Sequence, residues 1–184
     1  MKKEKIQLIW DSSVGLIVLA ILLVLVGTCT CIIGPFFMSN YRNKKAAKQT
    51  ACTFNQKQIA LTFTLYAQEN EGIFPPTEDW AATLGARDKL LYCPYYRAGG
   101  NSYAYNANVS GIRIEKMGNS ADVILTADSD AKSGIMRGAQ DIAFRHGDGR
   151  KNIGAIASFV DGHVTYMQKS GLKEVMFKPI LKNN

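Results

Sequence analysis

The chain has 184 residues, of which 47% are hydrophobic and 20% charged, and its formal net charge is +7 at pH 7. Residues 1–48 hold seven basic and two acidic side chains, a net charge of +5, whereas the other 15 basic and 13 acidic residues leave the rest near neutral at +2. Basic residues that flank an apolar segment are attracted to anionic lipid headgroups, so this distribution argues against a nucleic-acid-binding domain, and no nucleic-acid partner is expected.

The first predicted element is an uncharged apolar run at residues 14–38, VGLIVLAILLVLVGTCTCIIGPFFM. A helix rises about 1.5 Å per residue, so this run extends roughly 37 Å and can cross a hydrocarbon core of about 30 Å. It is longer than the apolar region of about 7 to 15 residues in a cleavable secretory signal. The run therefore predicts a single transmembrane helix in contact with membrane lipid, with a basic N-terminal segment at 1–13 and one domain at 39–184.

The basic residues around the span leave its orientation open, because three lysines precede it and four basic residues follow it, which only slightly favours a cytoplasmic C-terminal domain. Cys29 and Cys31 lie within the span, where a thiol acts as a small hydrophobic group. Cys52 and Cys93 lie in the domain. In a small exported domain they would form a disulfide that stabilises the fold by about 2–4 kcal/mol. Two buried free thiols are the alternative that the sequence leaves open.

A second helical segment follows the span, after Gly34-Pro35, which is expected to kink or break the helix. Residues 40–70 contain no Pro or Gly. Gly72 is a predicted C-cap, and Pro75-Pro76 prevents the helix from continuing. At 100° per residue, four side chains share one narrow stripe, which predicts an amphipathic helix packed on an apolar surface: Cys52, Ile59, Phe63 and Tyr66.

The rest of the domain has the pattern of a small sheet. A short helix is predicted from Thr77 to Leu84, and residues 129–152 have the composition of a polar loop. Asp161-Gly162 predicts a hairpin between the last two strands. The predicted fold is α+β: a single N-terminal transmembrane helix continuing into a long amphipathic helix packed on a small antiparallel sheet. The predicted strands are 102–107, 112–115, 123–127, 153–160 and 163–167.

The two histidines, His146 and His163, are the first candidates for chemistry, since Asp148 and Asp161 lie near them in the sequence. A catalytic zinc site needs a third protein ligand and usually a close helical spacing, and neither is present. Both histidines are better explained by hydrogen bonds to turn backbone. The Gly-x-Ser-x-Gly pattern of hydrolases is absent as well. The sequence therefore predicts no catalytic residue and a protein that is not an enzyme.

Asp128-Ser129-Asp130 is a second candidate site, because alternate carboxylates are hard oxygen ligands of the kind that Ca²⁺ prefers. Asp128 and Asp130 are therefore candidate calcium ligands. An EF-hand loop that began at Asp128 would need glycine at the position of Ser133 and glutamate at that of Ala139. The mismatch favours the alternative, in which the carboxylates end a strand and cap a turn.

Several short stretches, in the same order, resemble the type IV pilin-like proteins, which include the pseudopilins of type II secretion. They cover most of residues 47–167, and the likeness is greatest to a bacterial subgroup with a C-terminal His followed by an Asp-Gly hairpin. The stretches are AAKQTACTFNQKQIA, YAQENEGIFPP, LYCP, NSYAYN, VILTADS and FVDGHV. The family-motif residues are His146, Asn152, Asp161, Gly162 and His163.

This resemblance implies a pilin-like or pseudopilin-like structural subunit of a type II secretion or type IV pilus-type system. Its partners would be like subunits or other pilin-type secretion-system proteins. It also implies a single-pass protein of the bacterial inner (cytoplasmic) membrane, with the N-terminus inside and the domain in the periplasm or outside the cell. The alternative is a stand-alone membrane-anchored binding module that has lost prepilin processing.

The chain departs from the family in two respects. Fourteen residues separate His146 from Asp161, where the family usually has nine. The prepilin peptidase signature, a Gly followed by an aromatic residue and then by a Glu at the fifth mature position, is also absent. Gly15 is followed here by Leu16, and Ala20 stands where the Glu would be. The family Glu is thought to pair with a neighbouring subunit's N-terminus, so the departure predicts a chain that stays anchored.

Overall fold

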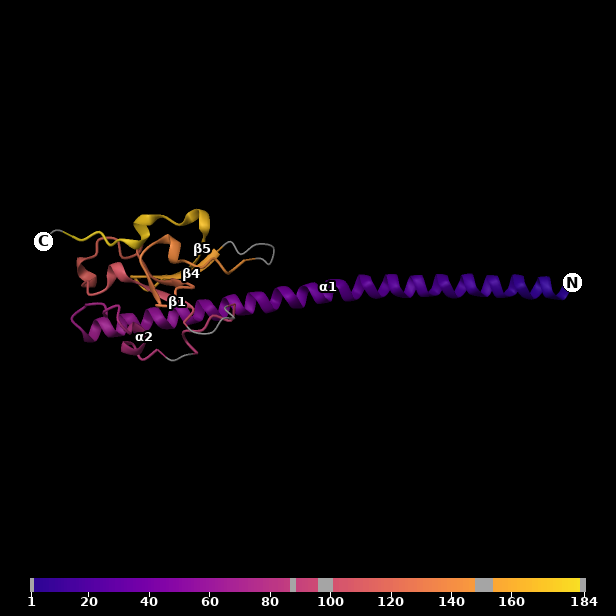
Figure 1. The fold of residues 1–184 in the computed structure, drawn as a ribbon, viewed down its shortest axis with the longest axis horizontal. Helices are drawn as coiled ribbons and strands as arrows, with labels where there is room; N and C mark the ends of the chain where they lie inside the picture. Colours follow the sequence, from indigo (N-terminus) through magenta and orange to yellow (C-terminus); the bar gives the residue numbers. More distant parts are fainter. Residues whose placement is uncertain (1, 87–88, 96–100, 148–153, 183–184) are drawn as a thin grey trace. The chain divides into compact units, whose positions relative to one another are not determined.

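A computed structural model of the protein describes residues 2–86, 89–95, 101–147 and 154–182, with side chains from residue 14 onward except at position 32. The chain forms two compact units, Met1–Lys44 and Lys45–Asn184. The long helix α1 (Lys2–Glu69) begins in the first unit and ends in the second (Figure 1).

In the N-terminal unit the described residues all belong to the first part of α1. One stretch of this helix is long and apolar enough to cross a membrane. None of the apolar window is buried within the protein. The helix runs through Pro35, so it does not break there, while a kink at this position stays a prediction. A proline inside a helix costs about 3 kcal/mol. The helix nevertheless continues through apolar residues on both sides of Pro35. Thr28 and Thr30 donate their hydroxyl groups to carbonyl oxygens one turn earlier, which satisfies these polar groups within the helix.

In the second unit, α1 is amphipathic as predicted. Cys52, Ile59 and Phe63 are fully buried, and Tyr66 is half-buried. The helix ends in a Schellman-type turn, in which the backbone N–H of the predicted cap Gly72 donates to the carbonyl of Ala67 at 2.7 Å. Gly72 has a φ of 76°, a left-handed conformation that glycine adopts without strain.

The domain contains one five-stranded sheet with the order β3-β1-β2-β4-β5. All neighbouring strands are antiparallel except β1 and β3, which pair in parallel, so the sheet is mixed and the prediction of a wholly antiparallel sheet is wrong. The strands are β1 (Tyr103–Asn106), β2 (Ile124–Asp128), β3 (Ile135–Met136), β4 (Gly154–Phe159) and β5 (Val164–Gln168).

Short helical turns connect these strands. The helix predicted over Thr77–Leu84 is the single turn α2 (Trp80–Thr83). The strand predicted at residues 112–115 is wrong: the segment enters the 3₁₀ turn η2 (Ile114–Lys116), from which Ile112 and Ile114 still pack on the core. The other 3₁₀ turns are η1 (Ala107–Val109), η3 (Ala139–Asp141), η4 (Lys169–Gly171) and η5 (Glu174–Phe177).

Both faces of the sheet are covered, so β4 is buried along its whole length. The part of α1 that belongs to the second unit lies along one face, and the segment with η4 and η5 lies along the other (Figure 1). Phe63, Tyr105 and Ile156 belong to the core beside α1. The second core includes Ala104, Ala127, Ala155, Ala157, Phe159 and Phe177.

The hairpin predicted at Asp161-Gly162 is confirmed and joins β4 to β5. The N–H of Phe159 donates to the carbonyl of His163 at 2.9 Å, and the N–H of Gly162 donates to the carbonyl of Phe159 at 2.9 Å. Gly162 has a φ of 91°, as a hairpin bulge requires.

Candidate functional site

Four buried side chains meet between α1 and the sheet, and we call them the His146 cluster: Cys52, Cys93, Asp128 and His146. Cys52 comes from α1, Cys93 from the loop after α2, Asp128 from the end of β2 and His146 from the segment before β4. The possible ligand atoms of the two cysteines and the histidine all lie within 4.8 Å of one another. Thus residues far apart in the sequence bring sulfur, nitrogen and oxygen atoms to one place.

Asp128, the last residue of β2, lies beside the imidazole of His146. Its Oδ2 accepts a hydrogen bond of 2.6 Å from the N–H of Ile156 on β4 and lies 3.0 Å from Nε2 of His146. Backbone bonds to Gly154 in both directions hold His146 beside the start of β4. The carboxylate and the imidazole are therefore positioned by the sheet itself.

Cys52 and Cys93 form a disulfide, the first of the two alternatives that the sequence left open. Their Cα atoms are 5.3 Å apart. The N–H of Cys93 also donates to Oγ of Ser102 at 3.0 Å, and Cys93 Sγ lies 3.7 Å from His146 Nε2. The disulfide ties the loop after α2 to α1 directly beside the imidazole. Cys29 and Cys31 are free and exposed.

Two polar atoms of the cluster are buried and have no hydrogen-bond partner in the part of the chain that the structure describes: Oδ1 of Asp128 and Nδ1 of His146. The ring of Tyr95 packs edge-on against the imidazole, with 4.7 Å between the ring centroids. Since all four cluster side chains are fully buried, the cluster presents no atom to a substrate in solution. The arrangement can hold a proton between acid and imidazole or, once the disulfide is open, a small cation.

The carboxylate of Asp128 also affects Tyr103, the residue opposite it in the β1–β2 pairing. Burial raises the pKa of Tyr103 well above its ordinary value, and the negative charge of Asp128 raises it further. The phenol therefore remains protonated at neutral pH. Asn55 of α1 lies 3.4 Å from the Tyr103 hydroxyl and donates at 2.8 Å to the carbonyl of Tyr92.

A buried polar network lies nearby and joins α1 to two strands. Gln56 Nε2 donates to the carbonyl of Ile156 at 3.3 Å, and its Oε1 accepts from the hydroxyl of Thr126. Thr126 Oγ1 is 2.6 Å from Oγ of Ser158. A register shift in the β2–β4 pairing between Ile124 and Thr126 accompanies this arrangement. These contacts fix the register of α1 on the sheet and so the position of Cys52.

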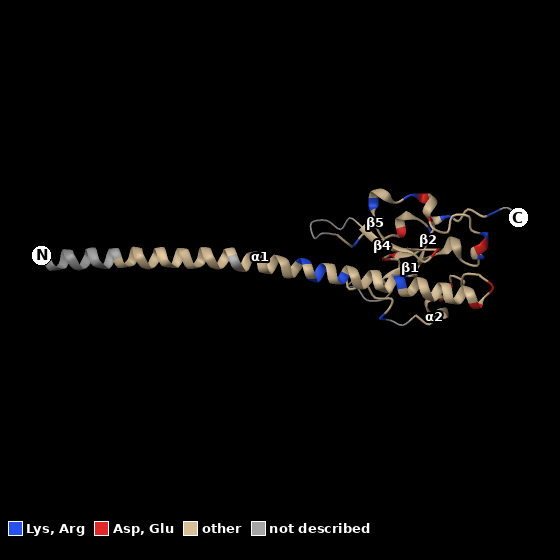
Figure 2. Cartoon of the chain, turned by 180° about the vertical axis from the view of Figure 1, so that it is seen from behind, with Lys and Arg blue, Asp and Glu red and all other residues tan. Residues whose placement is uncertain are grey.

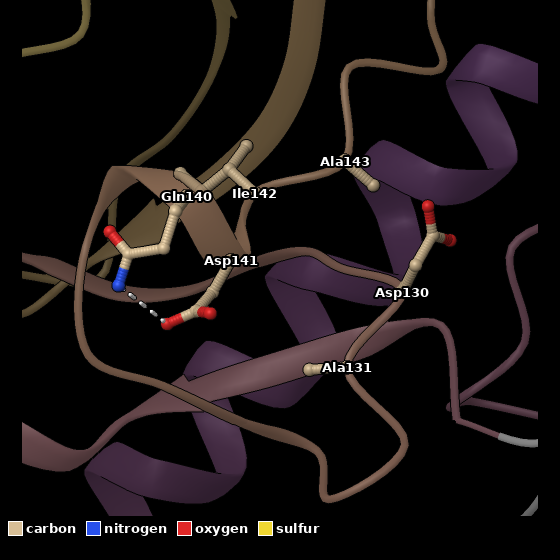
Figure 3. A pocket seen from close by; sticks show the side chains of 6 residues that line it. All are labelled: Asp130, Ala131, Gln140, Asp141, Ile142 and Ala143. Carbon is tan, nitrogen blue, oxygen red and sulfur yellow. Dashed lines mark hydrogen bonds between the residues drawn. The ribbon is translucent and has the colours of Figure 1, made fainter.

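The two candidate calcium ligands have different partners. Asp128 is fully buried against His146, whereas Asp130, with a side chain 66% exposed, pairs with Arg145 at 2.8 Å. Asp130 instead lines a pocket with Ala131, Gln140, Asp141, Ile142 and Ala143. Figure 3 shows its carboxylate at one side of this pocket and the Gln140–Asp141 pair at the other. Asp128 ends a strand, as the alternative to a calcium site predicted.

The two histidines contact different residues. His163 Nδ1 lies 2.6 Å from Oδ1 of Asp161 across the hairpin, and its ring stacks on Phe159 at 4.2 Å. Among the described residues, both imidazoles pair with aspartates, where the sequence predicted hydrogen bonds to turn backbone. The motif residue Asn152 lies outside the described residues. Asp148, which is near His146 in the sequence, also lies outside them. The Asp128–His146 pairing was missed, although an acidic residue at the end of an apolar strand is a signal for a buried charge that needs a partner.

Comparisons of the chain with models of protein families, with curated proteins and with solved structures give no match.

Proposed function

We propose that this protein is a membrane-anchored structural subunit of the pilin-like or pseudopilin-like type, which acts by assembly and not by catalysis. In this proposal residues 14–38 cross the bacterial cytoplasmic membrane with the N-terminus inside. Residues 39–184 form the domain in the periplasm or outside the cell. Its partners are copies of itself or other pilin-type proteins of a type II secretion or type IV pilus-type system.

The observation that carries this proposal is an exposed apolar stripe on the part of α1 that belongs to the domain. Phe54, Leu61 and Leu65 are 57%, 57% and 48% exposed. Their spacing of seven and four residues places them on one face of the helix, opposite the buried Ile59 and Phe63. A soluble domain gains nothing from an exposed apolar stripe unless another surface covers it.

The occupant we propose for the stripe is the equivalent helix of another subunit. Many apolar side chains of residues 14–38 are exposed on the same helix, among them Leu16, Leu23 and Phe37, so one helix offers apolar surface both in the proposed span and in the domain. Basic residues follow the apolar segment on α1 and are drawn in blue in Figure 2. In the sequence they include Arg42, Lys44, Lys45 and Lys48. Such a collar suits the headgroup region of a membrane. The disulfide supports a domain in an oxidising compartment.

The stripe can be tested by crosslinking through the span. The full chain would be expressed in bacterial membranes, and Cys29 and Cys31 would be oxidised with copper phenanthroline. We expect disulfide-linked dimers, and we expect Leu61→Ser/Leu65→Ser to reduce them severalfold because it removes the apolar contact. The matched control Gln68→Ser changes an exposed polar residue of the same helix and should leave the yield unchanged. If Leu61→Ser/Leu65→Ser gives the same yield of disulfide-linked dimers as the unmodified chain, assembly through this face is contradicted.

The second candidate function, a stand-alone anchored binding module, is favoured by the absence of a processing signature around Gly15 and Ala20. Mass spectrometry of the mature N-terminus separates the two candidates. Cleavage after Gly15 with N-methylation supports a processed subunit. An intact Met1, together with no disulfide-linked dimer in the crosslinking experiment, supports the anchored module.

A further inference from the structure

The His146 cluster places an imidazole and a carboxylate, both potential metal ligands, next to the two sulfur atoms of a disulfide. In a tetrahedral zinc site with ligands at about 2.0–2.3 Å, neighbouring ligand atoms are about 3.4–3.8 Å apart. Cys93 Sγ and His146 Nε2 are already 3.7 Å apart. Cys52 Sγ completes a group whose members all lie within 4.8 Å of one another. Once the disulfide is open and its two sulfur atoms have moved apart, three ligand atoms surround a space that a zinc ion can occupy.

Asp128 lies next to this group of three, against the imidazole of His146. Its Oδ2 is 3.0 Å from Nε2 of His146, and its fully buried Oδ1 has no hydrogen-bond partner among the described residues, nor does Nδ1 of His146. A buried carboxylate oxygen without a partner is costly, and a cation removes that cost. Two thiolates, an imidazole and a carboxylate suit the borderline-soft Zn²⁺ better than the hard Ca²⁺ or Mg²⁺.

We propose that the reduced form of this protein binds one Zn²⁺ through Cys52, Cys93 and His146, with the Asp128 carboxylate as the fourth ligand. A dithiol reductant breaks the S–S bond, supplies two electrons and two protons, and becomes a disulfide itself. Zn²⁺ then replaces the two thiol protons, which pass to solvent, while the neutral imidazole carries its proton on Nδ1 and coordinates through Nε2. The disulfide and the zinc site use the same sulfur atoms, so they exclude each other. This inference is independent of the proposed assembly function.

The test uses the full chain in detergent with Cys29→Ala/Cys31→Ala, because these two exposed thiols would otherwise bind metal themselves. A phosphine reduces the disulfide and becomes a phosphine oxide with oxygen from water; it is then removed under nitrogen. Co²⁺ is the probe, since it shows thiolate charge-transfer bands and intense visible bands in a tetrahedral site. We expect one Co²⁺ per chain, displaced by one equivalent of Zn²⁺. The oxidised chain of the same sequence should bind none.

Variants separate the cluster from nonspecific thiol binding. His146→Gln and Asp128→Asn should each weaken Co²⁺ binding about tenfold or more, whereas His163→Gln, at the other histidine, should leave it unchanged. Far-UV circular dichroism follows the fold in every state. The proposal is overturned if the reduced chain binds no Co²⁺, if the oxidised chain binds as well, or if His146→Gln has no effect. It is also overturned if the reduced chain unfolds and Zn²⁺ does not restore it.

Discussion

The carboxylate of Asp128 lies 3.0 Å from Nε2 of His146, and both side chains are fully buried. The same oxygen accepts the N–H of Ile156, so one carboxylate joins β2, β4 and the segment between them. Removing one member of such a pair leaves the other polar groups buried without a partner, and this costs more than the pair itself contributes.

We therefore expect Asp128→Ala to lower the free energy of unfolding by about 3–5 kcal/mol. Asp130→Ala is the matched control, because Asp130 is exposed and its ion pair should contribute about 0–1 kcal/mol. Thermal unfolding of the full chain in detergent, followed by circular dichroism, measures both. Equal losses in the two variants would contradict a special role for the buried carboxylate.

The disulfide makes a second prediction. Cys52 and Cys93 are 41 residues apart in the sequence, and a crosslink that closes a loop of this length stabilises a domain by about 2–4 kcal/mol. Cys52→Ala/Cys93→Ala should lose this stabilisation in a chemical unfolding experiment. Cys29→Ala/Cys31→Ala should not alter the unfolding of the domain; a loss there would mean that the span thiols also support it.

Tyr103 and Tyr105 predict sensitivity to alkaline pH. Burial raises the pKa of both phenols in the folded state. Above about pH 10 these tyrosines ionise in the unfolded chain but remain protonated in the folded one, so the free energy of unfolding falls as the pH rises. Melting temperatures between pH 9 and pH 11 should decline less in Tyr103→Phe than in the unmodified chain. Tyr92→Phe, at an exposed tyrosine, is the control, and its decline should match that of the unmodified chain.

The fourth prediction concerns Gly154, which lies against the ring of Tyr166. A Cβ atom at Gly154 would lie 2.2 Å from Cζ of Tyr166, far inside van der Waals contact. Gly154→Ala should therefore destabilise the domain by about 1–3 kcal/mol. The cost should largely disappear when Gly154→Ala is made in a Tyr166→Ala background, and unfolding free energies of the four chains give this coupling directly. An undiminished cost would place the strain elsewhere.

Local patterns predicted much of the fold. The stripe of Cys52, Ile59 and Phe63 follows helical periodicity, and Asp161-Gly162 has the conformational preference of a hairpin, so both elements depend on nearby residues only. The two-residue strand β3 lies in a segment with no strand pattern because its pairing with β1 is a long-range contact. Residues 112–115 alternate like a strand but pack from a 3₁₀ turn, since tertiary contacts override weak local preference.

The site was harder to predict for the same reason. The sequence identified Cys52 and Cys93 as a possible pair and His146 as a structural residue. It did not indicate that Asp128 is the partner of His146, because the pairing depends on how β2 and β4 align beneath α1. Asp128 was instead grouped with Asp130, its neighbour in sequence. Their different surroundings arise because β2 ends at Asp128, so Asp130 no longer follows the strand and pairs with Arg145 instead.

Phe177 covers the face of the sheet that α1 leaves open, and its carbonyl accepts from the buried amide of Asn106 at 3.1 Å. A ribosome must therefore translate past position 177 before β1 and β4 can be shielded from water. Premature stop codons upstream of Phe177 should therefore yield products that leave this face of the sheet exposed and are prone to degradation.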